Sequence, residues 1–233
     1  MIRTNAPPTA NGDHAYPIDA ILLLGPTGVG KSPLGDRLAS RGFLGRKAHH
    51  LDFGHALRSA ASDEAPSSYL PEELHFIRGI LEQGLLLEDE HFPLARKILA
   101  NALGRFGFCS DDLVVLNGIP RHIGQAKDIE SLFKVHALVV LDCPADAVYC
   151  RLRENAGGDR DVRQDDGVEL VQKKLALFHE RTRPLIDHFE RGRSKAYRIA
   201  VEERTTVDEV SAMLSSLAAG DPPVSLIAEP PQR

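Results

Sequence analysis

The run GPTGVGKS, residues 25–32, carries the strongest chemical signal in the sequence. It matches G-x-x-x-x-G-K-[ST], directly follows the apolar run AILLL and directly precedes a helical pattern. Glycines let the backbone curl so that its N–H groups face a phosphate, and the helix N-terminus adds positive potential. Lys31 can then reach the β- and γ-phosphates, and the Ser32 hydroxyl can ligate Mg²⁺. The sequence thus predicts a nucleotide-binding loop made by Gly25, Thr27, Gly28, Val29, Gly30, Lys31 and Ser32.

Further basic side chains follow the ends of other apolar runs. Arg58 lies one helical turn beyond LDFG, and Arg121 and Gln125 follow LVVLNGIP. The stretch RQDDGVELVQKKL adds Arg163, Asp165, Asp166 and Lys174. Arginine suits phosphate because its planar guanidinium binds two oxygens at once. Taken singly, Arg58 also fits a surface position, and the two aspartates also fit the cap of a following helix.

Five short runs rich in β-branched residues or leucine predict strands that would position these groups. They are residues 20–24, 49–53, 113–116, 137–141 and 196–201. The longest predicted helix covers residues 168–191 with a kink at Pro184, and a capping box at Thr206 and Glu209 opens the last helix. Strands alternating with helices favour an α/β three-layer sandwich, with ligands outside the carboxyl ends of parallel strands.

The composition sets further bounds. The chain has 233 residues, of which 42% are hydrophobic and 26% charged, as in soluble globular proteins. A net charge of -5 gives no general attraction to nucleic acid or anionic membranes, so an anion site must be built locally. No apolar run reaches the ~18 residues that span a bilayer, and no secretion signal opens the chain, so a cytoplasmic location is expected. Three cysteines without a C-x-x-C pair are expected to be reduced thiols.

In chain order, these motifs resemble the adenylate kinase family of nucleoside monophosphate kinases over about residues 19–217. The resemblance implies a P-loop NTPase fold with a five-stranded parallel sheet, a helical acceptor-binding insert near 53–86 and a short lid near 154–164. We expect one such domain at 18–219, with flexible segments at 1–17 and 220–233. The implied reaction moves the γ-phosphoryl group of ATP, with Mg²⁺, to a nucleoside monophosphate, AMP being the expected acceptor. Small-molecule nucleotides would be the partners of a monomer that binds neither nucleic acid nor membrane.

The resemblance also implies roles for single residues. Arg58 and Arg121 would grip the acceptor's phosphate, and Gln125 would read its base. The remaining acceptor-pocket residues would be Phe53, Gly54, Leu86, Leu87 and Gly118. The groups expected to stabilise the transferring phosphoryl group are Lys31, Arg121, Arg151, Arg163 and Lys174.

Three positions depart from the family pattern. Asn117 and His55 stand where the family has aspartates that orient water on Mg²⁺, and Asn155 stands where it commonly has a lid arginine. Losing a charge-assisted contact costs about 1.5–3 kcal/mol. We therefore hypothesise that an aspartate restored at position 117 raises kcat with Mg²⁺.

Two other functions fit these departures. The missing carboxylates favour a degenerate kinase fold that binds nucleotides as a sensor or partner-binding module. Phe53, at a position where adenylate kinases commonly have threonine, favours a small-molecule kinase with a different acceptor. Within the nucleotides, CMP, UMP and dAMP are alternatives to AMP.

Overall fold

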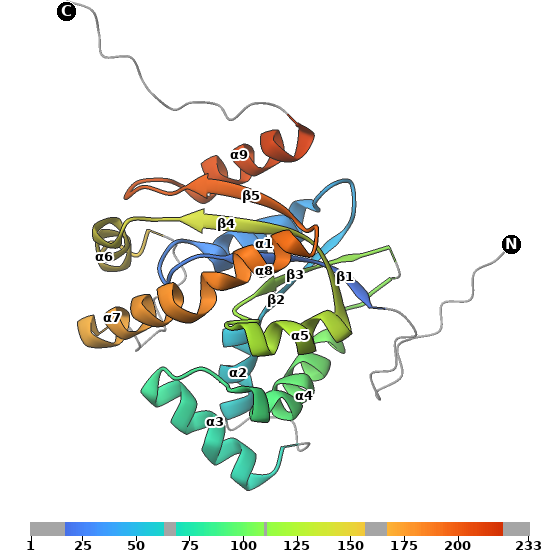
Figure 1. The fold of residues 1–233 in the computed structure, drawn as a ribbon, viewed down its shortest axis with the longest axis vertical. Coiled ribbons are helices and arrows are strands. Elements are labelled where there is room, and N and C mark those ends of the chain that lie inside the picture. Colours follow the sequence, from blue (N-terminus) through green and yellow to red (C-terminus); the bar gives the residue numbers. More distant parts are fainter. Residues whose placement is uncertain (1–16, 63–68, 110, 157–166, 221–233) are drawn as a thin grey trace, which may run out of the picture.

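The computed structural model describes residues 17–62, 69–109, 111–156 and 167–220. Its centre is one sheet of five strands in the order β2-β3-β1-β4-β5, in which every pairing is parallel (Figure 1). The strands are β1 (Ile18–Leu24), β2 (Ala48–Asp52), β3 (Leu113–Asn117), β4 (Phe133–Asp142) and β5 (Lys195–Ala200). The predicted five-stranded parallel sheet is thus confirmed.

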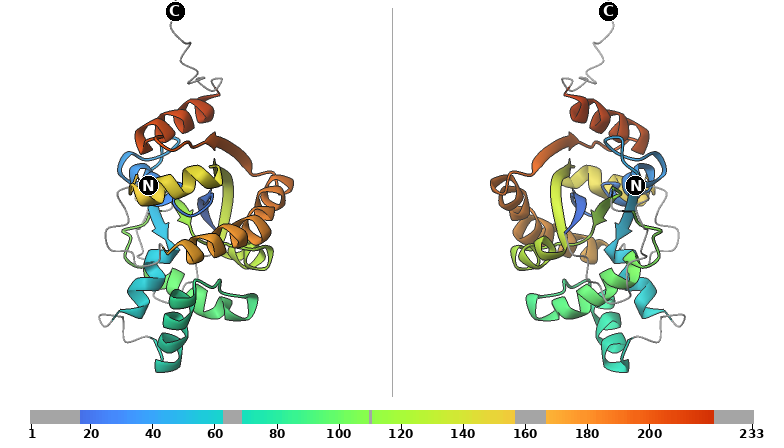
Figure 2. Two further views of the ribbon diagram at one scale, coloured as in Figure 1. Left: turned by 90° about the vertical axis from the view of Figure 1, so that its left-hand side faces the viewer. Right: turned by 90° about the vertical axis from the view of Figure 1, so that its right-hand side faces the viewer.

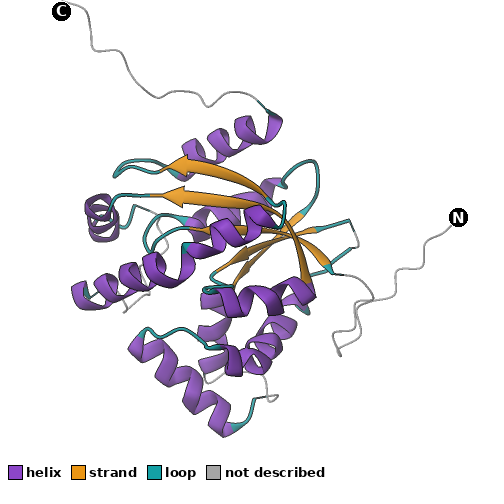
Figure 3. Cartoon of the chain, in the orientation of Figure 1, coloured by secondary structure: helices purple, strands orange, loops and turns teal. Residues whose placement is uncertain are grey.

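Helices cover both faces of the sheet (Figure 3). On one face, α1 (Lys31–Arg41) and α9 (Val207–Ala219) bury leucine and valine side chains against the strands. The other face is covered by α5 (Ile123–Leu132) and α8 (Pro184–Arg191). The central strands are buried on both faces, so their sequences are continuous apolar runs. The predicted three-layer α/β sandwich is confirmed.

Residues 53–62 and 69–103 form a helical group at one end of the sheet, seen below it in the views of Figure 2. The group consists of α2 (Phe53–Ala61), α3 (Pro71–Gln83), the short η1 (Asp89–His91) and α4 (Phe92–Leu103). Its apolar side chains join the same core cluster as α5 and α8. The predicted acceptor-binding insert therefore falls on helices that pack against the sheet and against one another.

β4 begins at Phe133, four residues before the predicted start. Its first half alternates, with Phe133 buried and Lys134 and His136 exposed, whereas residues 137–141 are all buried. His136 pairs with Asp19 at 2.7 Å on neighbouring β1. A half-solvated strand start carries polar residues, so the search for an apolar run missed it.

The long helix predicted over 168–191 is broken near Pro184, as expected. It runs as α7 (Val168–Leu177), a π-helical turn η2 (Phe178–Thr182) and α8, with Pro184 at the first position of α8. The Arg183 N–H bonds to the Phe178 carbonyl at 2.8 Å, five residues back. Proline lacks an N–H and crowds the preceding turn, which a wider turn accommodates.

The capping box that opens α9 is confirmed. Thr206 Oγ1 accepts from the Glu209 N–H at 3.3 Å, and Glu209 accepts from the Thr206 N–H at 2.7 Å. The predicted segments at 1–17 and 220–233 lie outside the described residues except for Pro17 and Gly220, and so does most of the predicted lid. In the part of the chain that the structure describes, no helix is long and apolar enough to span a membrane.

Candidate active site

The loop between β1 and α1 has the backbone expected of a phosphate-binding loop. Gly28 and Gly30 have φ angles of +77° and +100°, a left-handed conformation that favours glycine. Lys31 Nζ donates to the carbonyl oxygens of Gly25 and Pro26 at 2.8 and 2.6 Å, so the side chain folds over the loop. α1 begins at Lys31, so its N-terminal turn adds its N–H groups to the same place.

One cavity of about 200 Å³ brings the two predicted halves of the site together. From the loop, it is lined by Thr27, Gly28, Gly30, Lys31 and Ser32. Every predicted acceptor residue also lines it: Phe53, Gly54, Arg58, Leu86, Leu87, Gly118, Arg121 and Gln125. Lys174 of α7 completes the wall. Of the predicted loop residues, Gly25 and Val29 lie behind the lining, and the Val29 side chain is buried in the core.

The backbone of Arg121 is hydrogen-bonded on both sides, whereas one nitrogen of its guanidinium group is not bonded within the described residues. Its N–H donates to Gln125 Oε1 at 2.8 Å, and its carbonyl accepts from Thr182 Oγ1 at 2.8 Å. Its Nε is buried with no hydrogen-bond partner among the described residues. Burial lowers the pKa of Arg121, and the nearby charge of Asp52 partly opposes this. A cationic group that is buried but incompletely bonded is suited to an anionic ligand.

A carboxylate that the sequence analysis did not single out lies beside the phosphate loop. Asp52, the last residue of β2, accepts the Ser32 Oγ hydrogen bond on Oδ2 at 2.6 Å. Asn117 Nδ2 donates to the same oxygen at 3.1 Å and to Ser32 Oγ at 3.1 Å. The other oxygen, Oδ1, accepts from the His55 N–H at 2.9 Å and caps α2. Asp52 is therefore a missed site residue.

The environment of Asp52 keeps it ionised. Burial alone would raise its pKa, but the hydrogen bonds from Ser32 and the His55 backbone, with the charges of His50 and Arg58, outweigh burial. The net result is a pKa below the usual value for aspartate. The two missing family carboxylates therefore do not leave this corner of the cavity without a negative charge.

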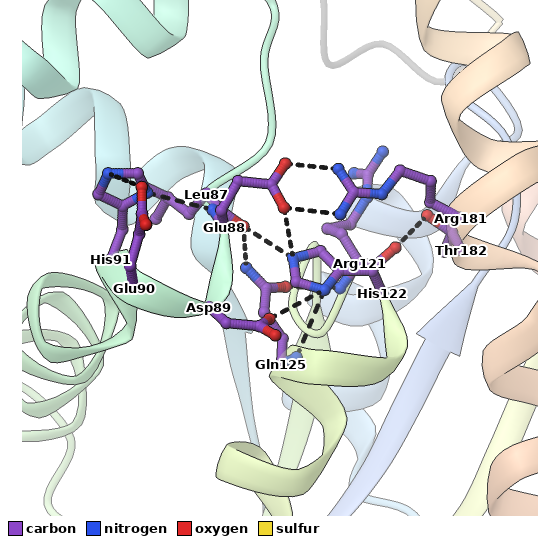
Figure 4. Close-up of polar contacts among 10 residues, drawn as sticks. All are labelled: Leu87, Glu88, Asp89, Glu90, His91, Arg121, His122, Gln125, Arg181 and Thr182. Atoms are coloured by element: carbon purple, nitrogen blue, oxygen red, sulfur yellow. Dashed lines mark hydrogen bonds and ion pairs between the residues drawn. The ribbon is translucent and has the colours of Figure 1, made fainter.

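Figure 4 shows how the far end of the cavity is organised around the Leu87 carbonyl. Gln125 Nε2 and His122 Nε2 both meet this oxygen at 2.8 Å. With Oε1 accepting from the Arg121 N–H, both ends of the Gln125 amide are bonded, and only 2% of the residue is exposed. Gln125 thus links the segment around Leu87 to the backbone of Arg121.

A two-point ion pair fixes the segment next to Leu87 (Figure 4). Arg181 of η2 donates to Glu88 Oε1 at 2.5 Å and Oε2 at 2.7 Å. The hydrogen bond from Arg181 lowers the pKa of Glu88, although burial opposes it. The helical group at 53–62 and 69–103 is therefore tied to the π-helical turn on the other side of the cavity.

Phe53 contributes mainly to the core. It is 6% exposed and belongs to the apolar cluster formed with α2, α3 and α4. A Cβ added at Gly118 would lie 3.6 Å from the Phe53 Cβ, so the ends of β2 and β3 are closely packed here. Phe53 thus belongs to the core while also lining the cavity.

The structure places the Arg151 side chain among backbone carbonyl groups. Its Nη1 donates to the carbonyl oxygens of Glu202 at 2.8 Å and Thr205 at 2.8 Å, and its Nε donates to that of Gly28 at 3.3 Å. Arg151 is 4% exposed and is not among the described residues that line the cavity. It therefore holds the loop after β5 against the phosphate loop, and its expected role at the transferring phosphoryl group stays a prediction.

Two further predictions fall at the predicted lid. Arg163, with Asp165 and Asp166, lies outside the described residues. Asn155 follows α6 (Ala145–Arg153) with φ +48°, and the next residue's N–H bonds to the Arg151 carbonyl at 3.0 Å. Asparagine tolerates this left-handed conformation better than arginine does, so Asn155 serves the end of the helix.

Comparisons with known proteins identify the family. No family model matches the chain. An adenylate kinase of Thermus thermophilus is 30% identical over 202 residues, covering 84% of this chain and 94% of that protein. The chain belongs to the adenylate kinase family. An adenylate kinase of Haloarcula marismortui is 27% identical over 215 residues, covering 82% of this chain and 92% of that protein. A uridylate kinase of Saccharomyces cerevisiae is 29% identical over 184 residues, covering 78% of this chain and 82% of that protein.

The predicted family and class of enzyme are thereby confirmed: the chain is a nucleoside monophosphate kinase, a nucleotide-binding phosphotransferase. The donor set also fits a hard divalent cation. The Ser32 hydroxyl and the Asp52 carboxylate meet beside the phosphate loop, and Mg²⁺ prefers such oxygen ligands.

Proposed function

We propose that this enzyme transfers the γ-phosphoryl group of ATP to AMP and releases two molecules of ADP. A phosphate oxygen of the acceptor attacks the γ-phosphorus, and the bond to the β,γ-bridging oxygen breaks. The chain supplies alignment and positive charge and needs neither a covalent intermediate nor a strong base. The observation that carries the proposal is Arg121, which lines one cavity with Lys31 of the phosphate loop and whose buried Nε has no hydrogen-bond partner among the described residues.

The residues that line the cavity suggest which of them hold the donor and which hold the acceptor. Lys31 and the loop backbone would hold the donor's phosphates, and Arg58 and Arg121 would hold the acceptor's phosphate. Two polyanions repel each other in water, so cations fixed on both sides favour their approach. Ser32 would hold Mg²⁺, which when bound neutralises charge on the donor phosphates.

The base end of the cavity supports AMP. The Gln125 amide and the Leu87 carbonyl offer donors and acceptors of the kind that adenine needs. To read a base, Gln125 would exchange its bond to Leu87 for one to the ligand. Several of the similar proteins are named adenylate kinases, which supports the same acceptor.

A panel assay tests the proposal. The enzyme is incubated with Mg²⁺·ATP and AMP, dAMP, CMP, UMP or GMP, and nucleotides are separated by chromatography. We expect two ADP per ATP consumed with AMP, at a higher kcat/KM than with any other acceptor. Binding of ATP and AMP without turnover would instead indicate a sensor. Turnover restricted to UMP or CMP would place the acceptor preference elsewhere.

A further inference from the structure

Asp52 and Asn117 occupy the same corner of the cavity from neighbouring strands. In the register of β2 and β3 their Cα atoms are direct partners, and both strands end at these residues. Asn117 Nδ2 and Ser32 Oγ converge on one oxygen of Asp52. The carboxylate that the sequence lacks at position 117 is thus present one strand away.

We propose that Asp52 is the positioning residue for Mg²⁺ in this enzyme: its Oδ2 fixes the Ser32 hydroxyl and orients the hydration shell of the ion. The inference rests on the proposed function and adds a residue to it. Ser32 can ligate the ion only through its oxygen. Because the hydroxyl proton is donated to Asp52, a lone pair of that oxygen would be left for the ion. Asp52 also adds the negative charge that an amide at position 117 cannot supply.

Capping α2 does not explain why residue 52 is an aspartate. The cap uses Oδ1, which accepts from the His55 N–H, and asparagine or serine caps a helix about as well. Oδ2 points instead at Ser32. The second oxygen and the charge therefore need another explanation, and the contact with a predicted metal ligand supplies one.

The same geometry revises the hypothesis about position 117. A carboxylate only accepts hydrogen bonds, so the amide group that faces Asp52 is the NH₂ of Asn117. An Asn117→Asp change alone would set two carboxylates against each other and remove both donated bonds. We therefore do not expect that change to raise kcat. The informative change is a double substitution, Asp52→Asn with Asn117→Asp, which moves the carboxylate from the end of β2 to the end of β3.

The test is a metal-binding measurement on the protein saturated with ATP, without acceptor. Mn²⁺ replaces Mg²⁺, and the free ion is followed by electron paramagnetic resonance. We expect Asp52→Asn to raise the Mn²⁺ dissociation constant at least about tenfold. The exchange variant Asp52→Asn/Asn117→Asp keeps the total charge and should return the constant to within about threefold of the original. Asp187→Asn, an equal charge change at an exposed position on α8, is the matched control and should change nothing.

The outcomes separate this inference from the proposed function. If Asp52→Asn binds ATP in EDTA as the unaltered enzyme does and holds Mn²⁺ equally well, the metal role of Asp52 is wrong while the kinase assignment stands. If Asp52→Asn weakens AMP binding but leaves the Mn²⁺ constant unchanged, Asp52 serves the acceptor arginines, which also overturns the inference. If the unaltered protein does not bind ATP, the proposed function fails and this inference fails with it.

Discussion

The Arg181 guanidinium and the Glu88 carboxylate form a two-point ion pair that joins the π-helical turn to the segment beside the Leu87 carbonyl. The two residues are 93 positions apart in the chain. Because the Leu87 carbonyl also accepts hydrogen bonds from Gln125 and His122, this pair helps to fix the end of the cavity where we propose that the base binds.

Replacing Arg181 by glutamine should lower the free energy of unfolding and remove the part of it that depends on pH through Glu88. Both side chains are partly exposed, so we expect a coupling with Glu88→Gln of about 0.5–1 kcal/mol in a double-mutant cycle. The hydrogen bond from Arg181 lowers the folded-state pKa of Glu88. The stabilisation is therefore fully present above the usual glutamate pKa of about 4.3 and is lost as the pH falls below it. Urea unfolding at several pH values checks this, and a gap between variant and unaltered enzyme that persists at low pH would contradict it.

Arg121→Met should separate function from stability. The change removes the cation that we propose holds the acceptor phosphate, so kcat/KM for the monophosphate should fall at least about 100-fold. The folded protein should lose little stability or gain some, because a buried Nε without a partner is costly. Thermal melting and steady-state kinetics measure both, with exposed Arg105→Met as the control. A large fall in melting temperature at normal kcat/KM would show that Arg121 is structural.

Gln125→Leu should cost both stability and base selectivity. The Arg121 N–H would lose its acceptor inside the protein, a penalty of about 1–3 kcal/mol. If Gln125 also reads the base, the ratio of kcat/KM for AMP to that for UMP should fall toward one. A destabilised variant with an unchanged ratio would limit Gln125 to its structural role.

Arg151→Met should lower the stability of the protein and, with it, the affinity for ATP. Its guanidinium serves several buried carbonyl oxygens, so we expect a loss of about 2 kcal/mol or more in the free energy of unfolding. ATP affinity should fall with it, because the loop after β5 supports the phosphate loop. Calorimetric ATP binding and denaturant unfolding test this. A fall in kcat with ATP affinity and stability unchanged would support the transition-state role first expected for Arg151.

Local patterns in the sequence predicted the elements that depend on local interactions. The strand ends at Leu24 and Asn117, the loop that opens α1 and the cap at Thr206 follow from apolar runs, glycines and side-chain oxygens. The break at Pro184 follows from proline's missing N–H. Each of these signals lies within a few residues of the feature it predicts.

The parts that were missed depend on which strands are neighbours. That Asp52 meets Asn117 and Ser32 follows from the order β2-β3-β1, which no short motif contains. The resemblance drew attention to positions 55 and 117, where carboxylates are absent, and away from position 52. The acceptors of Arg151 lie more than 50 positions along the chain, so helix spacing alone left its partners open.

A single-turnover experiment with ATP labelled in the γ-phosphate tests the central claim most directly. Enzyme in excess over Mg²⁺·ATP is mixed with AMP, and the products are separated after rapid quenching. Two facing phosphate sites predict that the label appears in the β-phosphate of ADP made from AMP. Label released as inorganic phosphate, or left in ATP while both nucleotides are bound, would contradict direct transfer across this cavity.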